Sequence, residues 1–517
     1  MSIPAIRAAL DPIAAMLQAG AVGLYALAQA LLVLYASHRG LTLWRLWWGR
    51  PLAAGRDNPA PAGDLPAVTV QLPLYNERRV AGRLIDAVAA LEYPAGRLEI
   101  QVLDDSDDET LGCVDAAVAR HRARGVDIQL LRRPERPGHK AGALAAGMTH
   151  ARGEWIAVFD ADFVPPPDFL MRVARHFGDR GVGMVQARWG HLNRDRSLVT
   201  AGQAVMLDSH FLLEHEARMR RGLFFNFNGT AGVWRRACIE DAGGWSHDTL
   251  TEDLDLSYRA QLRGWRFVFD AAIEVPAELP ADLEALKSQQ RRWARGSIQT
   301  ARKLLPAIAA SGLPIGVKLE AFIHLTSNVC YPLLLILALM LLPVLLVARR
   351  APAPLDWGLQ IGLGLLGIVS VVLFLAAGQL VAGRRGRAVP ADVAAALLLC
   401  TGLSVNNARA VLGGFGPRLG DWERTPKTGE GTRGERLAPY PSARGLAGRT
   451  ELLLALYFAG LTAVAWTVGQ WRAIPFIALL VAGFGVVGLS SLRASLGSGR
   501  CRGTRPRAGR SYSSAGP

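Results

Sequence analysis

The sequence predicts an α/β domain inserted between apolar helices that cross a membrane. The chain has 517 residues, of which 50% are hydrophobic, and long uncharged runs lie towards both of its ends. Between these runs, from about Val68 to Pro280, short β-like segments alternate with helical stretches. Acidic motifs follow several of the β-like segments, at the strand ends where open α/β sheets bind their ligands.

The charge balance favours a membrane surface over nucleic acid as the partner of the basic residues. Lys and Arg number 58 against 43 Asp and Glu, a net charge of +15. These residues cluster beside the apolar runs and do not form one basic domain, so we expect no nucleic-acid partner. The five cysteines have no CxxC or Cys/His ligand spacing, which predicts reduced structural thiols and neither a zinc site nor a disulfide framework: Cys113, Cys238, Cys330, Cys400 and Cys501.

The first 50 residues are predicted to be an N-terminal transmembrane anchor. Residues 12–37 carry no charge and precede a basic flank that contains His38, Arg39, Arg45 and Arg50. A cleaved signal peptide is the alternative. However, Arg7 is the only basic residue before the apolar run, and this run is longer than the apolar region of an ordinary signal peptide.

The C-terminal half contains further apolar runs, which follow an amphipathic stretch at 281–320. Four of them, at 322–348, 357–383, 452–471 and 473–492, predict spans within a membrane region covering 321–493. The run 391–412 contains Asp392, Asn406, Asn407 and Arg409 and predicts an interfacial helix on the cytoplasmic side. This arrangement gives five spans with the N-terminus outside, and it places the basic loops 383–387 and 413–449 and the basic, disordered tail 494–517 in the cytoplasm. If 391–412 crosses the membrane instead, there are six spans.

Residues 51–280 form the predicted soluble domain, and two acidic pairs follow its strands. Asp160 and Asp162 end an apolar strand in a DxD arrangement that suits a divalent cation bridging a diphosphate. Taken alone, the pair is equally well explained as loop capping. Asp104 and Asp105 end another strand and could accept hydrogen bonds from a base or ribose, although by themselves they resemble a turn signal.

Three further motifs carry residues suited to sugar or phosphate chemistry. Lys140 lies in a small-residue loop, 137–143, that could approach phosphates, although an ordinary exposed loop is the favoured reading in isolation. Thr251 is placed to cap a helix whose first turn contains Asp253, a candidate general base, although such carboxylates often only favour the helix dipole. Gln289, Arg292 and Trp293 share one helix face and could bind hydroxyls, phosphate and a sugar ring, or anchor the helix at the membrane.

Together these motifs resemble the processive family 2 glycosyltransferases of the cellulose synthase superfamily. QLPLYNE (71–77), LDDSD (103–107), FDADF (159–163), TEDLD (251–255) and QQRRW (289–293) occur in the order of that family. Four further segments have sequences closest to those of cellulose-synthase-like (gluco)mannan and xyloglucan-backbone synthases and their bacterial relatives: 184–195, 224–232, 276–280 and 287–300. The resemblance is strong over 65–305, and 402–411 and WERTPKTG (422–429) extend it.

The resemblance implies a GT-A nucleotide-sugar-binding fold with a mixed, Rossmann-like sheet, inversion at the anomeric carbon, and a Mg²⁺ or Mn²⁺ ion. It implies that Asp105 contacts the nucleotide, that Asp160 and Asp162 bind the diphosphate and the metal, and that Asp253 is the base. Glu77, Asp104 and Lys140 are the further candidate donor contacts. Gln289, Arg292 and Trp293 would lie at the diphosphate and the acceptor end. WERTPKTG resembles a gating loop, which makes Arg424 and Lys427 candidate phosphate contacts.

We therefore expect a membrane glycosyltransferase that moves hexose from UDP-glucose or GDP-mannose to a growing β-glycan, in a processive manner. A glycolipid synthase that adds one or two hexoses to a lipid acceptor is one alternative, and a non-catalytic transport or scaffold protein is another. We expect the protein in a bacterial inner membrane, in contact with lipids and with its catalytic domain in the cytoplasm. The predicted spans are fewer than in bacterial cellulose synthases, which leaves room for additional secretion subunits.

Overall fold

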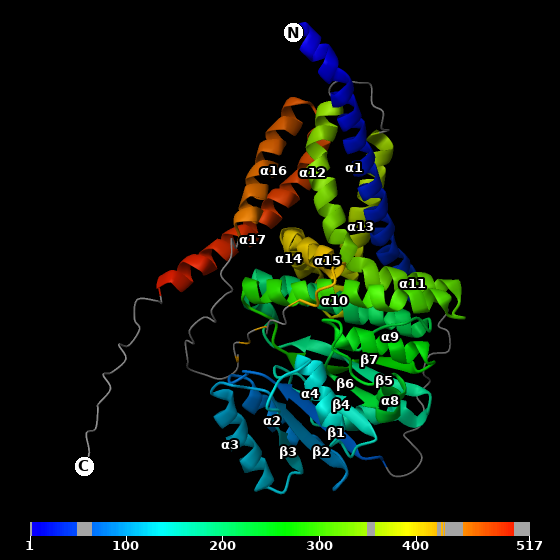
Figure 1. Ribbon diagram of the computed structural model, residues 1–517, viewed down its shortest axis with the longest axis vertical. Coiled ribbons are helices and arrows are strands. Elements are labelled where there is room, and N and C mark those ends of the chain that lie inside the picture. Colours follow the sequence, from blue (N-terminus) through cyan, green and yellow to red (C-terminus); the bar gives the residue numbers. More distant parts are fainter. Residues whose placement is uncertain are drawn as a thin grey trace, which may run out of the picture.

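A computed structural model describes residues 3–48, 65–348, 357–420, 425, 427, 429 and 448–500. A sheet domain forms one end of the molecule and a group of long apolar helices forms the other (Figure 1). Helices α10 (Leu283–Ala310) and α11 (Ile315–Thr326) lie between the two parts (Figure 1).

The sheet has seven strands in the order β3-β2-β1-β4-β6-β5-β7. Strand β6 pairs antiparallel with both of its neighbours and the remaining pairs are parallel, so the predicted mixed α/β sheet is confirmed. The strands are β1 (Val68–Leu74), β2 (Leu98–Asp104), β3 (Ile128–Leu131), β4 (Trp155–Val158), β5 (Val182–His191), β6 (Gly232–Arg235) and β7 (Arg266–Ala277).

Helices cover both faces of this sheet, so its central strands are buried on both sides. This burial explains why the sequences of these strands are nearly continuous apolar runs. One core joins the strands to α2 (Ala81–Ala89), α3 (Thr110–Arg122) and α5 (Phe169–Ala174). A second core on the other face holds α4 (His139–Met148), α8 (Arg236–Asp241) and α9 (Glu252–Leu262). The short strand β6 and the strand β7 were not recognised as strands from the sequence.

Within its described residues, the structure has five helices that are long and apolar enough to cross a membrane, at 15–47, 315–346, 362–381, 449–467 and 471–494. They correspond to the five predicted spans. The helices that contribute are α1 (Ile3–Trp47), α11 with α12 (Cys330–Ala348), α13 (Trp357–Val381), α16 (Arg449–Thr467) and α17 (Ile474–Arg500).

The run predicted as one interfacial helix at 391–412 is two helices. Helices α14 (Val389–Gly402) and α15 (Ser404–Gly414) meet at an angle of 51°, and the pair could form a sixth span only as a bent one. Helix α15 packs against α10, and α14 packs against both α17 and α6 (Leu198–Ser209), so the pair joins the two parts of the molecule.

The basic end of α1 docks onto the sheet domain through ion pairs. Arg39 donates to Glu214 at 2.7 Å, and both His38 and Arg45 pair with Glu320 of α11. The basic flank that predicted a cytoplasmic end therefore also fixes the helix to its neighbours.

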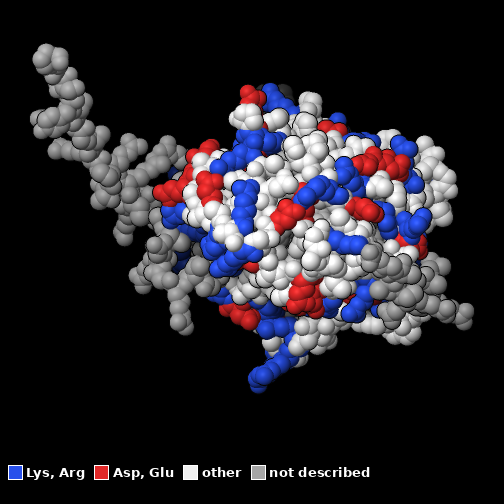
Figure 2. Space-filling model, turned by 90° about the horizontal axis from the view of Figure 1, so that it is seen from below, with Lys and Arg blue, Asp and Glu red and all other residues white. Residues whose placement is uncertain are grey.

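The remaining short elements complete the chain. They are a π-helix (His210–His215), α7 (Glu216–Arg220) and 3-10 turns at Arg175–Gly178, Arg194–Arg196, Ser327–Val329, Gly386–Ala388 and Trp471–Ala473. The four described cysteines are free thiols; Cys501 lies outside the described residues. Over the end of the sheet domain farthest from the apolar helices, basic and acidic side chains are interspersed (Figure 2).

Candidate active site

A cleft with a cavity volume of about 180 Å³ lies where the sheet domain meets α10. Its walls come from the ends of β1, β4, β5 and β7, the first turn of α9 and one face of α10. Ten of the predicted site residues line it: Glu77, Asp105, Lys140, Asp160, Asp162, Asp253, Gln289, Arg292, Trp293 and Lys427.

The two DxD carboxylates lie in the turn that follows β4, and each faces a lysine. Asp160 accepts from Lys140 Nζ at 2.5 Å, and its backbone N–H donates to Thr230 Oγ1 at 2.9 Å. Asp162 is 6% exposed and accepts from Lys427 Nζ at 2.6 Å. The turn therefore presents two carboxylates, each of which pairs with a lysine ammonium.

This carboxylate pair fits a divalent cation that a substrate helps to bind. No group of three or more His, Cys, Asp and Glu side chains is arranged to hold a metal within the described part of the chain. Mg²⁺ is commonly held by one or two carboxylates together with substrate phosphates and water. Asp160 and Asp162 supply such oxygen ligands, and a nucleoside diphosphate would supply the rest.

Lys140 is not the solvent-exposed loop lysine that its motif, taken alone, predicts. Its side chain is 15% exposed, and Nζ also donates to the Gly229 carbonyl at 2.9 Å. Burial lowers the pKa of the ammonium, but the nearby carboxylates of Asp160, Glu252 and Asp253 outweigh this effect and raise it. Lys140 is thus a fixed cation in the cleft.

The adjacent Asp104 and Asp105 have different surroundings. Asp104 does not line the cleft: it is 1% exposed and accepts from Arg132 Nε and Nη2 at 3.0 and 2.9 Å. Asp105 lines the cleft and accepts from Arg133 Nε at 3.0 Å. Nearby, the Arg136 guanidinium lies over the Tyr75 ring. The structure thus brings Asp105, and not Asp104, to the place expected of a nucleotide contact.

The first turn of α9 sends its carboxylates in two directions. Glu252 and Asp253 line the cleft, whereas Asp255 is fully buried and pairs with Arg259 and with Lys303 of α10, both at 2.8 Å. The predicted side-chain cap at Thr251 is wrong, because its hydroxyl makes no cap hydrogen bond and lies 3.2 Å from that of Thr300.

Asp253 has the electrostatic surroundings of a base. Burial, followed by the neighbouring Glu252 carboxylate, raises the pKa of Asp253 to about 7, against the lowering effect of Lys140. Burial also raises the pKa of Glu252. A carboxyl with a pKa near neutrality can accept a proton efficiently at physiological pH. Gly229 leaves room for it, since a Cβ there would lie 3.0 Å from Asp253 Oδ2.

Helix α10 carries the QQRRW face into the cleft. Gln289, Arg292 and Trp293 all line it, as their spacing predicts. Arg292 Nη2 donates to Thr425 Oγ1 at 2.8 Å. The helix therefore places a guanidinium and an indole opposite the carboxylates of the sheet.

The three described residues of the WERTPKTG stretch, Thr425, Lys427 and Gly429, contact residues of the cleft. Besides its bond to Asp162, Lys427 Nζ donates to the Glu278 carbonyl at 3.0 Å, and the Gly429 N–H donates to Glu278 Oε2 at 3.1 Å. Arg424 lies outside the described residues. No role was predicted for Glu278, and its position in the motif PAELP (276–280) is what could have indicated one. No role was predicted from the sequence for four other residues that line the cleft: Trp189, His191, Asn228 and Thr425.

Residues 66–296 match a family model described as glycosyltransferase like family 2. They form a glycosyltransferase family 2 domain. The predicted resemblance is confirmed, and the mixed sheet with its acidic strand ends is the expected GT-A type of fold. The apolar helices flank this glycosyltransferase domain in the chain.

Two curated relatives of the glycosyltransferase domain are plant proteins. The chain is 42% identical over 273 residues to glucomannan 4-beta-mannosyltransferase 1 of Oryza sativa subsp. japonica, covering 50% of this chain and 52% of the relative. It is 40% identical over 279 residues to glucomannan 4-beta-mannosyltransferase 2 of Arabidopsis thaliana, with 52% of each covered. The chain thus spans about half the length of the curated relatives it matches.

Among solved structures, the chain is similar to a mannosyltransferase from Pyrobaculum calidifontis in complex with GDP-Man and Mn²⁺. The identity is 22% and the TM-score is 0.49, over 77% of this chain and 99% of the other.

Proposed function

We propose that the chain is an inverting, metal-dependent glycosyltransferase that moves mannose from GDP-mannose to the end of a β-glycan. One observation carries the proposal: Asp253, whose pKa is raised to about 7, faces the same cleft as the DxD carboxylates Asp160 and Asp162. A base and a diphosphate-binding site in one cleft are what a single displacement at a sugar carbon requires.

Asp253 removes the proton from the acceptor hydroxyl. As that oxygen bonds to the anomeric carbon of the donor, the bond from this carbon to the diphosphate oxygen breaks. The attack and the departure occur on opposite faces of the sugar, so its configuration inverts. Glu252 assists by raising the pKa of Asp253, which makes it a stronger proton acceptor.

The diphosphate leaves with added negative charge, which cations in the cleft offset. Lys140 and Arg292 supply two of them from opposite walls. Asp160 and Asp162 would hold a Mg²⁺ or Mn²⁺ ion, which contributes further charge neutralisation when bound. Lys427 pairs with Asp162, which brings a further cation close to the diphosphate-binding carboxylates.

The choice of donor rests on the names of the relatives. Curated proteins at 40–42% identity over the domain are glucomannan 4-beta-mannosyltransferases. We therefore favour GDP-mannose over UDP-glucose, and processive extension over a single addition. Trp293 and Gln289 offer an indole face and an amide to the acceptor sugar.

We further infer that the protein is integral to a membrane, with the glycosyltransferase domain in the cytoplasm. The five apolar helices and the basic residues at the inner end of α1 support this topology. A bacterial inner membrane, lipid contacts and additional secretion subunits belong to the same proposal. Membrane fractionation and labelling of engineered cysteines from each side of the membrane test it.

The enzymatic test is incubation of the purified protein in lipid with Mn²⁺ or Mg²⁺ and radiolabelled GDP-mannose or UDP-glucose. We expect a high-mass product that a β-mannanase digests, with β-linkages by linkage analysis. Chloroform-extractable label would instead identify a glycolipid synthase. Absence of transfer from these and other common donors would overturn the proposal in favour of a non-catalytic protein.

A further inference from the structure

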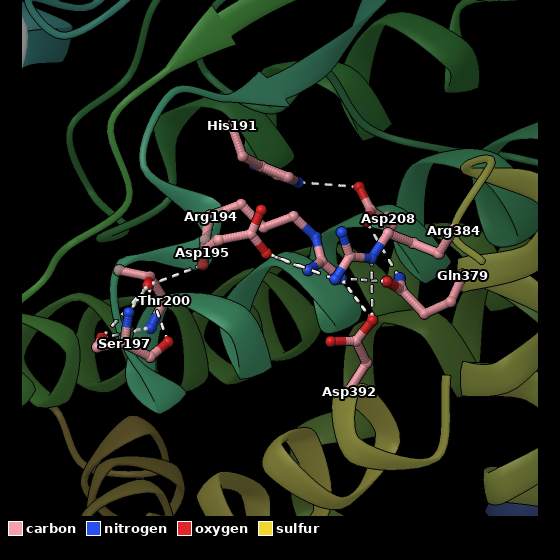
Figure 3. Close-up of polar contacts among 9 residues, drawn as sticks. All are labelled: His191, Arg194, Asp195, Ser197, Thr200, Asp208, Gln379, Arg384 and Asp392. Carbon is pink, nitrogen blue, oxygen red and sulfur yellow. Dashed lines mark hydrogen bonds and ion pairs between the residues drawn. The ribbon is translucent and has the colours of Figure 1, made fainter. Parts of the chain in front are cut away.

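A chain of buried polar contacts runs from the wall of the cleft to the apolar helices (Figure 3). It begins at His191, the last residue of β5, and continues through Asp208 of α6 and Gln379 of α13 to Arg194 and Asp392. None of these contacts is used by the chemistry proposed above.

The first link holds the imidazole in one orientation. His191 Nε2 lies 2.9 Å from Asp208 Oδ1, and the two side chains are only 7% and 5% exposed. Although burial raises the pKa of Asp208, hydrogen bonds from His191 and Gln379 outweigh it and lower the pKa. Asp208 is thus a carboxylate that accepts from Nε2, and Nδ1 is the ring nitrogen that this contact leaves for another partner.

The rest of the chain fixes Asp208 itself. Gln379 Nε2 donates to Asp208 Oδ2 at 3.1 Å, while Gln379 Oε1 accepts from Arg194 Nη2 at 2.5 Å. The same Arg194 nitrogen lies 3.1 Å from Asp392 Oδ2, which also accepts from Arg384 Nε at 3.1 Å. Buried networks in which each member has a partner are rigid, so the imidazole is held from two transmembrane-region helices.

His191 lies on the cleft wall, with three strands between it and Asp105. The nucleotide contact Asp105 follows β2, whereas His191 ends β5, and β1, β4 and β6 separate these two strands in the sheet. Its neighbours on the cleft wall include Trp189 and Leu207. The strand order therefore separates His191 from Asp105, while Asp208 and Gln379 connect His191 to the apolar helices.

The second ring nitrogen is available to a ligand. Among the described residues the His191 ring makes one hydrogen bond, between Nε2 and Asp208. Nδ1 has no hydrogen-bond partner among them and is not fully enclosed by protein. His191 lines the cleft, so a ligand bound there can approach its ring. A fixed acceptor beside an aromatic wall is suited to a sugar hydroxyl.

We propose that His191 binds the acceptor glycan by accepting a hydrogen bond at Nδ1 from a sugar hydroxyl, and that Asp208 is its positioning residue. This inference rests on the proposed function, because it takes the ligand to be a glycan. It adds a specificity element that depends on the apolar helices, since Gln379 completes the support of Asp208.

The test compares His191→Ala, His191→Asn and Asp208→Asn with the unaltered protein in lipid, using a β-1,4-linked mannohexaose as acceptor. Loss of one neutral hydrogen bond predicts a rise of about three- to tenfold in acceptor KM for His191→Ala. Asparagine keeps an acceptor atom near Nδ1, so His191→Asn should recover part of the loss. The KM for GDP-mannose should change much less than the acceptor KM.

An unchanged acceptor KM in folded His191→Ala overturns the inference, and so does a parallel rise in the donor KM, which indicates a structural role. Direct binding separates this result from failure of the proposed function. Calorimetric titration with mannohexaose needs no transfer, and weaker binding by His191→Ala than by the unaltered protein supports the inference even if no donor reacts. Equal binding, or none by either protein, overturns it.

Discussion

Replacement of Asp253 by asparagine tests the catalytic base directly. The substitution keeps the size and polarity of the side chain but removes its ability to take a proton. A general base contributes about 10²- to 10⁴-fold to a rate, so we expect kcat to fall by that factor, or about 3–5 kcal/mol in the barrier. Donor affinity, measured as GDP or GDP-mannose binding with Mn²⁺, should change little.

The raised pKa gives the same prediction a second readout. Only ionised Asp253 can act as the base, and its pKa is about 7. Between pH 7 and pH 6 the ionised fraction falls from about one half to about one tenth, so kcat/KM of the unaltered protein should fall about fivefold. The residual activity of Asp253→Asn should lack this acid limb.

Stability should move in the opposite direction to activity. The folded-state pKa lies above the ordinary value of 3.8, so ionisation of Asp253 opposes folding, and stability is lost as pH rises from about 4 to about 7. At about 1.4 kcal/mol per pH unit, the loss is on the order of a few kcal/mol. Asp253→Asn should therefore have the higher Tm at pH 8, and the difference should vanish near pH 4.

Asp255→Asn is the matched control, because it neutralises a carboxyl of the same helical turn that does not line the cleft. Asp255 pairs with Arg259 and Lys303, so its loss should lower Tm but leave the acid limb of the remaining activity in place. Near-normal kcat in Asp253→Asn, or an acid limb that persists in it, would refute the assignment of the base.

Three other predictions test the cleft and its support. Asp162→Asn should raise the Kd for GDP at least tenfold in the presence of Mn²⁺ and much less in its absence, by calorimetric titration; an equal effect with and without the ion would contradict metal ligation there. Lys427→Met should raise the KM for GDP-mannose several-fold, because it removes a cation that lies beside Asp162; an unchanged donor KM would place the lysine outside donor binding. Lys287 of α10 and Glu451 of α16 form a buried ion pair at 2.8 Å. Lys287→Met leaves the Glu451 carboxylate buried and unpaired, so it should lower the free energy of unfolding by about 3–5 kcal/mol and lower Tm clearly. Lys287→Met combined with Glu451→Leu should regain much of this stability.

The sequence located most of the site because its motifs lie at local structural boundaries. Asp160 and Asp162 follow an apolar strand, and Gln289, Arg292 and Trp293 share one face of α10, as their spacing required. It could not separate Asp104 from Asp105, because both end the same strand. Only the packing of Arg132 around Asp104 removes that carboxylate from the cleft.

The sequence by itself determined the type of most principal elements, because hydrophobic runs and helical spacing are local properties of a chain. It determined the apolar helices, most strands of the sheet and the acidic residues at their ends. The tertiary structure alone decided which distant groups meet. Lys427 pairs with Asp162 across 265 positions, and Asp208 joins Gln379 across 171. The pKa of Asp253 has the same origin, since it depends on burial and on the charges that folding brings around it.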